Sequence, residues 1–303
     1  MRRSGTTLNI DSPGVAALDL PGPRSFDRFG SSVAVLPPAD PASNGSATLL
    51  VGAPFHRPNA TCRTGCLMVG SVYGFWLGSN ATVAPPPAFT LVGDSSLGEF
   101  GFSIAVSVVN RSAASANAAS ANADGQIAIS ASDDAQIAIS APDASRGGIT
   151  HLTSARSGRV SLFDGTALRQ LSGVVNLSRV ASRAAIWGDA AHGSFGASLG
   201  WTTLDDGAAA LVAAAPRESS TTLLLSGREK GALYVWRAEA LPAGETSVKS
   251  AAFSHKGGRP RAQLGAAFSP LGGAAGLRLA VGSPRAVIGS MEQAGAVDVL
   301  SVF

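Results

Sequence analysis

Charged residues are scarce in this chain of 303 residues, and long apolar runs are missing. Asp, Glu, Lys and Arg make up only 14% of the sequence, and the formal net charge is +3. A nucleic-acid-binding surface requires a basic patch with interleaved aromatic residues. The basic residues here are scattered, apart from one predicted loop that contains His255, Lys256, Arg259 and Arg261. No stretch reaches the ~18 apolar residues of a membrane-spanning helix. We therefore expect no nucleic-acid partner and no membrane span in this chain.

Cysteine is almost absent, since Cys62 and Cys66 are the only two in the chain. Zinc binding would require two further ligands, and only His56 lies near them in the sequence. Two cysteines four residues apart, with Gly65 between them, are able to close a small disulfide loop. The disulfide is the favoured interpretation, and free thiols and a metal site are the alternatives.

Catalytic motifs are also missing. The four histidines fall in separate predicted loops, and no glycine-rich phosphate-binding loop is present. Residues 196–200 match the Gly-x-Ser-x-Gly pattern of a hydrolase nucleophile elbow, but that elbow requires a strand-to-helix turn. The match falls instead on a segment that recurs along the chain and has the pattern of a strand. We therefore predict that this chain is not an enzyme.

Glycine, by contrast, is abundant, with 36 residues, and it marks a repeat that occurs four times. Each copy has an aromatic–Gly or related pair that opens a short strand. An apolar strand that ends in Gly-Ala-Pro or a near relative follows, and then a Gly-led alternating strand. The three segments of each copy are 28–35, 49–54 and 70–75; 99–106, 137–142 and 158–163; 194–201, 211–216 and 231–236; and 263–270, 279–284 and 295–300. Such self-similarity indicates a repeat architecture.

A fourth apolar segment precedes each of these pairs. The four segments are 15–20, 89–94, 184–189 and 251–256. Four short antiparallel strands per radial repeat form the blade of a β-propeller. We therefore predict an all-β fold, a β-propeller of four-stranded blades within one domain spanning 1–303. The predicted blades are 15–76, 89–164, 184–237 and 251–303.

The second copy carries two unusual segments. Residues 112–124 are low in complexity and are predicted to form a mobile loop. Just beyond them, 125–134 is nearly repeated as 135–144, so that only one of the two segments is available as the second strand of that blade.

Phe-Gly followed by Gly-Ala-Pro resembles the FG-GAP repeat, as at Phe29-Gly30 and Gly52-Ala53-Pro54. That repeat builds the N-terminal propeller of integrin α subunits, and it also occurs in glycosylphosphatidylinositol-specific phospholipase D. The resemblance covers nearly all of the chain, although copy two has Ser-Ala-Pro and copy four has Leu-Gly and Gly-Ser-Pro. It implies a non-catalytic extracellular module that binds a protein or glycan partner in cell adhesion, with a partner subunit if the chain is integrin-like. The alternative is an accessory propeller of a larger hydrolase that resembles the phospholipase. Short disulfides within a blade are common in the family, which makes pairing of the two cysteines relevant.

The resemblance also points to calcium, because the hairpin between the Phe-Gly and Gly-Ala-Pro strands often binds this ion in the family. Calcium requires several oxygen ligands at short, fixed spacings. Copy one has Asp40 and Asn44, but Thr48 stands where the last acid belongs, and copy three has Asp206 without the other ligands. These three residues are the candidate metal ligands. Because every set is incomplete, we favour ordinary polar turns and expect no cofactor and no tight calcium binding.

The compartment is predicted from asparagine. Five of the eight asparagines begin an Asn-x-Ser/Thr triplet without proline, which is the acceptor pattern for N-glycosylation. They are Asn44, Asn59, Asn80, Asn110 and Asn176. The excess predicts a glycosylated chain that is extracellular or on the cell surface, where a disulfide is also favoured.

Loops on a rigid scaffold carry recognition, and the predicted recognition loops are 37–47, 107–124 and 202–208. The repeat starts on a fourth strand and stops after a third, so that 15–20 is able to pair with 295–300 and close a ring. We favour instead an open arc that belongs to a longer protein. Its apolar end faces are expected at Leu50 and Val51 and at Leu279 and Val281.

Overall fold

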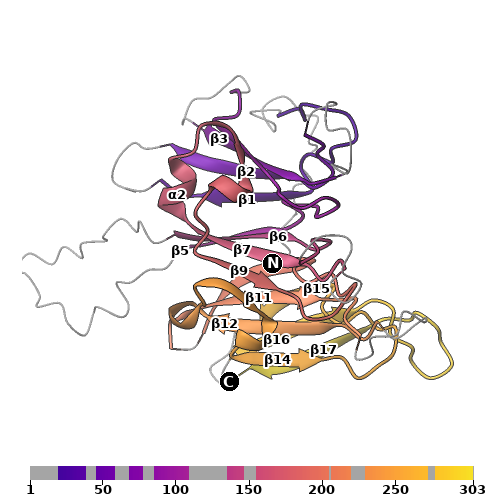
Figure 1. The fold of residues 1–303 in the computed structure, drawn as a ribbon. Helices are drawn as coiled ribbons and strands as arrows, with labels where there is room; N and C mark the ends of the chain where they lie inside the picture. The colour runs from indigo at the N-terminus through magenta and orange to yellow at the C-terminus, as the bar shows by residue number, and fades with distance from the viewer. Residues whose placement is uncertain are drawn as a thin grey trace, which may run out of the picture.

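The computed structural model describes residues 20–38, 46–58, 68–77, 85–108, 135–146, 155–204, 206–219, 229–271 and 277–302. Within these residues the chain is all-β, which confirms the predicted fold class at that level. Helix there is limited to α2 (Gly165–Arg169) and three short 3-10 turns, η1 (Leu177–Arg179), η2 (Ala238–Ala240) and η3 (Val248–Ser250). The strands form four separate sheets, numbered 1 to 4 in chain order. In Figure 1 sheet 1 lies at the top and sheet 2 below it, and sheets 3 and 4 overlap at the bottom of the view.

Each sheet has a set of antiparallel strands that follow one another in the chain order, and sheets 1 and 2 each carry one further, parallel strand that is described below. Sheet 1 contains β1 (Ser32–Leu36), β2 (Ala47–Ala53), β3 (Ser71–Leu77) and β4 (Phe89–Val92). Sheet 2 contains β5 (Ile104–Val108), β6 (Ala135–Ala141), β7 (Arg159–Asp164) and β9 (Ala184–Trp187). Sheet 3 contains β10 (Ser198–Thr203), β11 (Ala209–Ala215), β12 (Ala232–Arg237) and β14 (Phe253–Lys256). Sheet 4 contains β15 (Ala267–Leu271), β16 (Leu277–Ser283) and β17 (Ala296–Val302).

The fourth strands pair differently from the prediction. β4 pairs with β3, β9 with β7 and β14 with β12, so each belongs to the sheet that precedes it in the sequence. The repeat pattern predicts a blade of 89–164, but segment 89–94 completes the sheet of 32–77, and the same displacement by one strand applies at 184–189 and 251–256. For β4 the reason is that a short antiparallel return places a strand beside the one just before it. β9 and β14 take the same place in their sheets after an intervening strand that pairs elsewhere. Among the described residues, sheet 4 therefore has only three strands.

Glycine allows consecutive sheets to approach closely at the corner where the chain passes between them. A Cβ on Gly70 would lie 2.2 Å from the carbonyl oxygen of Phe100, and one on Gly93 would lie 2.4 Å from that of Val69. Such distances exclude any side chain larger than hydrogen. The next two junctions repeat this arrangement at Gly158 with Gly188 and at Gly231 with Gly257. The high glycine content is thus explained by the sheet-to-sheet corners.

The first strands of consecutive sheets lie beside one another: β1 contacts β5, β5 contacts β10 and β10 contacts β15. Two serines tie these strands together, because Ser32 Oγ donates to the Gly101 carbonyl and Ser198 Oγ donates to the Gly265 carbonyl, each at 2.7 Å. No strand pairing joins sheets 1 and 4 in the described part of the chain. The four sheets therefore form an open series there.

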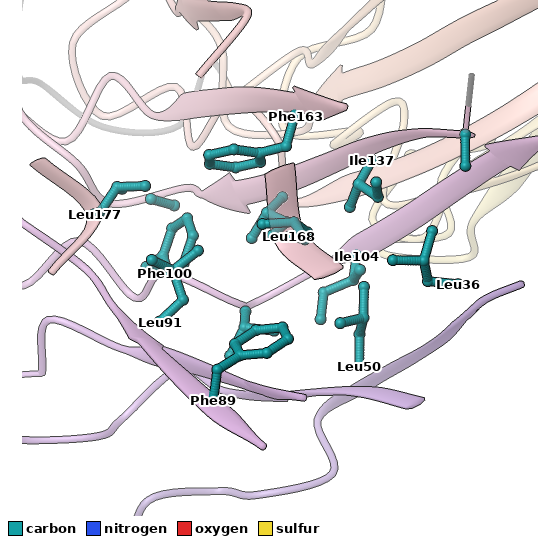
Figure 2. Close-up of a cluster of buried hydrophobic side chains, with 14 of the residues drawn as sticks. Leu36, Leu50, Phe89, Leu91, Phe100, Ile104, Ile137, Phe163, Leu168 and Leu177 are labelled. Atoms are coloured by element: carbon teal, nitrogen blue, oxygen red, sulfur yellow. The ribbon is translucent and has the colours of Figure 1, made fainter. Parts of the chain in front are cut away.

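Three hydrophobic clusters fill the three junctions between neighbouring sheets. Figure 2 shows the first of them, where Leu50 and Phe89 of sheet 1 face Ile137 and Phe163 of sheet 2. All four side chains are buried. Sheets 2 and 3 each contribute one face to one junction and the other face to the next. A single sheet is therefore unable to bury both faces alone, as is usual in a repeat array.

Two short strands cross back to the preceding sheet, a feature that the repeat pattern did not predict. After β7 and α2, β8 (Gly173–Asn176) pairs in parallel with β4 of sheet 1, and the chain then returns through η1 to β9. After β12 and η2, β13 (Gly244–Ser247) pairs in the same way with β9 of sheet 2. Each crossing strand covers an outer sheet edge that would otherwise be open to pairing.

The end faces also differ from the prediction. Leu50, Leu279 and Val281 are fully buried in the junctions, and Val51 packs with Tyr73 in a separate cluster. The expectation that these four residues form exposed end faces is wrong. Leu50, Leu279 and Val281 point into the junctions. Because side chains alternate across a strand, Val51 lies on the opposite face of β2, where Tyr73, Phe75 and Phe29 pack around it. Segment 135–144 supplies β6, whereas its near-copy 125–134, the loop 112–124 and residues 15–19 lie outside the described residues.

Candidate functional site

Each sheet has two different ends. The connections from first to second strands and from third to fourth strands lie at one end of the sheets, which we call the hairpin end. The connections from second to third strands lie at the opposite end, which we call the loop end. The connection from each fourth strand to the first strand of the next sheet lies there too. The predicted recognition loops 37–47, 107–124 and 202–208 all connect first to second strands. Of their residues, 39–45, 109–124 and 205 lie outside the described ones.

Asp206 lies in the turn between β10 and β11 at the hairpin end. Its Oδ1 accepts the backbone N–H of Ala208 at 2.9 Å, and its Oδ2 accepts a hydrogen bond from Arg237. The hydrogen bond from Arg237 is the main cause of a lowered pKa of Asp206, and the hydrogen bond from the Ala208 N–H is the second. Both carboxylate oxygens of Asp206 thus already accept hydrogen bonds, one within the turn and one from Arg237.

The other candidate ligands, Asp40 and Asn44, lie outside the described residues. In the part that the structure describes, no group of three or more His, Cys, Asp or Glu residues is placed to hold a metal ion. The same part contains no helix with the length and apolar character needed to span a bilayer.

One predicted modification residue is described. Asn176 ends β8 at the outer edge of sheet 1, its side chain is exposed, and it makes no capping hydrogen bond to η1. Asn44, Asn59, Asn80 and Asn110, and both Cys62 and Cys66, lie outside the described residues.

Buried polar side chains tie the loop end together. The Nδ1 atom of His56 lies 2.8 Å from Asp27 Oδ2 and 3.2 Å from the hydroxyl of Tyr73. All three residues are buried, and burial raises the pKa of Tyr73. The sequence predicts only a loop position for His56, whereas the structure makes it the link between two loops of copy one.

The same repeat positions are polar in copy three. Tyr234 donates to Glu218 Oε2 at 2.6 Å, and Lys256 Nζ lies 2.9 Å from Glu218 Oε1. Burial is the main cause of a raised pKa of Tyr234, and the negative charge of Glu218 raises it further. Because copies two and four have Ala144 and Ala286 where His56 and Glu218 stand, these buried pairs differ from copy to copy and belong to individual loops.

Glu99 is half-buried at the loop end, near a second carboxylate. Burial raises its pKa to about 7, and repulsion from Asp143 adds to this while Arg156 opposes it. Arg156 donates to Asp143 through Nε at 3.0 Å. Asp143 therefore holds the arginine, and the charges of Arg156 and Arg28 only partly offset the rise in the pKa of Glu99.

A cavity of about 140 Å³ opens at the loop end of the junction between sheets 3 and 4. Its polar lining residues are His255 from β14, Arg259, Ser283 from β16 and Asp298 from β17. Ser283 Oγ donates to Asp298 Oδ2 at 3.3 Å, and Arg259 lies 3.8 Å from Asp298 Oδ1. The cavity thus has acceptors and donors from both sheets.

The same positions at the other two junctions hold closely packed side chains. His255 lies opposite Leu233 in the β12–β14 pair, whereas Leu91 and Ile186 occupy that place opposite Val72 and Val160, and both are fully buried. Ser283 precedes a proline where the other copies have Ala53, Ala141 and Ala215, and Asp298 stands where they have Tyr73, Ser161 and Tyr234. The first junction therefore has Leu, Ala and Ser where the third has His, Ser and Asp.

The size and chemistry of this cavity limit what it is able to bind. Pockets for whole small-molecule ligands usually measure about 300–1,000 Å³, so the cavity fits one side chain or one sugar substituent. Ser283 donates to Asp298 and not to an imidazole, which differs from the relay of a serine hydrolase. The sequence did contain a signal for this site. When the copies are aligned on Gly101, Gly196 and Gly265, His255 falls in the same column as Leu91 and Ile186.

The Gly-x-Ser-x-Gly match has a structural role. Ser198 lies on β10, and its hydroxyl bonds the backbone of the next copy instead of facing a helix N-terminus.

Comparison with known proteins adds no further assignment: no protein-family model matches the chain, and no curated protein matches it.

Proposed function

We propose that this chain is an integrin-α-like propeller of FG-GAP repeats that acts as a non-catalytic extracellular interaction module and binds a protein or glycan partner. Four successive sheets, each with its first strand beside the first strand of the next, support the radial arrangement of such a propeller. The exposed Asn176 supports an extracellular location, since its triplet is accessible to glycosylation.

The observation that carries the binding function is the cavity at the third junction. Replacing core residues by His255, Ser283 and Asp298 lowers the packing that a repeat array relies on, and a retained cost of this kind is typical of a functional site. We place recognition at the loop end, around this cavity. A hydroxyl, amide or charged group that projects from a partner matches its carboxylate, imidazole and guanidinium groups.

The experiment compares the protein with a variant that restores the first junction, His255→Leu, Ser283→Ala and Asp298→Ser. Both are screened against immobilised glycans and secreted or cell-surface proteins, with Glu239→Gln in η2, outside the cavity and the predicted recognition loops, as the matched control. We expect binding to at least one probe, lost at least tenfold in the triple variant and unchanged in the control. Equal binding by the triple variant, or no binding by the original chain, overturns the assignment.

The alternative function is that of an accessory propeller in a larger hydrolase that resembles glycosylphosphatidylinositol-specific phospholipase D. In this alternative the chemistry belongs to another domain of the larger protein, and the propeller is an accessory to it. The full-length reading frame distinguishes the two functions, because a metal-binding catalytic domain upstream of Met1 favours the hydrolase.

A further inference from the structure

The connection from β14 to β15 is basic, whereas the equivalent connections at the other two junctions begin with an acid. Each connection starts at a glycine whose N–H donates to the glycine just before the third strand. The residue after this glycine is Asp94 at the first junction and Asp189 at the second, but Gly258 at the third. Arg259 and Arg261 then follow Gly258. The third junction therefore lacks the acid and has two arginines close behind its place.

A third arginine lies beside this connection. The backbone N–H of Arg285 donates to the Ala262 carbonyl at 3.3 Å, so the connection from β16 to β17 is bonded to the one from β14 to β15. Both Ala262 and Arg259 line the cavity between sheets 3 and 4. Arg259, Arg261 and Arg285 are all exposed. Three exposed arginines thus lie on two bonded loops at the edge of the cavity.

The positive charge of these two loops is not balanced within the described part of the chain. The acids on the neighbouring loop of sheet 3 already have cations, since Glu218 pairs with Lys256 and Glu229 with Arg217. Neither Arg261 nor Arg285 has an ion-pair partner among the described residues. Residues 257–264 and 284–295 contain these three arginines against one acid, Glu292. A partner with negative charge is therefore complementary to this surface.

Arg259 is placed to hold a carboxylate. Its Nη1 atom lies 3.8 Å from Asp298 Oδ1, which is beyond hydrogen-bond distance, and its side chain is 49% exposed. The guanidinium group has five N–H donors in a planar fork that matches a carboxylate. Asp298 accepts a hydrogen bond from Ser283 and keeps it when Arg259 pairs with another acid. An incoming carboxylate thus makes the hydrogen bonds that Asp298 leaves unmade.

A rigid apolar hairpin follows Arg285 in the same loop. Ile288 and Met291 exchange two backbone hydrogen bonds, at 3.1 and 3.0 Å. Val287, Ile288 and Met291 are nevertheless 44%, 37% and 59% exposed. Ordered apolar side chains lose little conformational entropy when a partner covers them, and Met and Arg are enriched at protein interfaces. Neither loop contains Phe, Tyr or Trp on which a sugar ring would stack. These features favour a protein partner over a glycan.

We infer that the partner of this site is a protein segment in which Asp or Glu alternates with apolar residues. Its carboxylates bind Arg259 and Arg285 at the edge of the cavity, and its apolar side chains pack on the hairpin 287–291. This inference rests on the proposed function, because it names the partner of the same cavity. Since the contact is ionic and exposed, binding weakens as salt is added.

Arrays of synthetic peptides of about twelve residues test the inference. The first array has Glu and Leu in varied order among Ser and Gly, and two matched arrays replace Glu by Gln or Leu by Ser. We expect the whole chain to bind members of the first array and to bind their counterparts in either matched array at least tenfold more weakly. Binding to the first array should also weaken at high salt.

Two double variants assign the binding to the two loops. Arg259→Gln with Arg285→Gln, and Ile288→Ser with Met291→Ser, should each weaken binding to the first array at least tenfold. The matched control is Arg179→Gln with Arg278→Gln, which changes the net charge equally at exposed positions in η1 and β16. The control should bind as the original chain does. Circular dichroism checks that every variant keeps its β structure.

The outcomes separate this inference from the proposed function. No binding to the first array, equal binding to the Gln array, or full binding by either double variant overturns the inference. A heparin fragment that binds more tightly than the peptides, and equally well to the hairpin variant, also overturns it and assigns the site to anionic glycans. An uncharged partner whose binding is lost in the triple cavity variant supports the proposed function and contradicts the acidic partner.

Discussion

Three glycine-to-alanine substitutions separate the two reasons for which particular positions of this fold require glycine. Gly207 has φ +80°, and the place of its missing Cβ is open space. Gly188 has no positive φ, but a Cβ there would lie 2.2 Å from the Ser157 carbonyl oxygen. Gly158 combines both, with φ +89° and 2.2 Å to the Phe195 carbonyl oxygen.

The expected losses follow from these two effects. An alanine at positive φ costs about 1 kcal/mol. Overpacking against backbone that must shift costs roughly 3 kcal/mol. We therefore expect the free energy of unfolding to fall by about 1 kcal/mol for Gly207→Ala, about 3 kcal/mol for Gly188→Ala and about 4 kcal/mol for Gly158→Ala, if the two effects add.

Urea unfolding followed by circular dichroism measures these free energies, provided that the slope against urea stays constant among the variants. A loss of about 4 kcal/mol approaches the whole stability of many domains, which is about 5–15 kcal/mol, so Gly158→Ala is expected to be the least stable of the three. Equal losses for Gly158→Ala and Gly207→Ala would refute the close approach between sheets. A negligible loss for Gly188→Ala would refute it independently, because no conformational strain contributes there.

Three further predictions concern single side chains. The pKa of Glu99, about 7 in the folded state against 4.5, means that its contribution to stability is complete below pH 4.5 and is lost as the pH rises through 7. Glu99→Gln should remove this part of the pH dependence of the unfolding free energy. The upper bound is roughly 3 kcal/mol, and solvent screening of the partly exposed side chain makes the expected change smaller. An unchanged pH profile contradicts this. Ser198→Ala should cost about 1 kcal/mol because it removes the bond to the Gly265 carbonyl, whereas the exposed Ser31→Ala control should cost little; equal melting of both variants argues against the link. Expression in a secreting eukaryotic host should attach a glycan at Asn176, and intact-mass spectrometry of Asn176→Gln should show its loss; an unmodified Asn176 contradicts the accessibility of β8.

The repeat made most of the strands predictable. The aromatic–Gly strand, the Gly-Ala-Pro strand and the Gly-led strand recur with local patterns that are independent of their neighbours, and the structure has strands at all three places in each copy. Three of the fourth segments are also strands, but the sequence pattern assigns them to the wrong sheet, since β4 pairs with β3 and not with the strands that follow it. A strand pattern shows that a segment pairs, whereas the connection and the packing decide with which neighbour.

The sequence by itself determined the all-β class, the number of copies and the glycine positions, because these depend on local backbone geometry and side-chain alternation. Only the tertiary structure decided the crossing strands β8 and β13, which are short and largely exposed and acquire their partners from another copy. It also decided that His255, Ser283 and Asp298 surround one cavity, since they come from three strands in two sheets. Contacts between copies arise when the sheets pack, and no pattern within one copy encodes them.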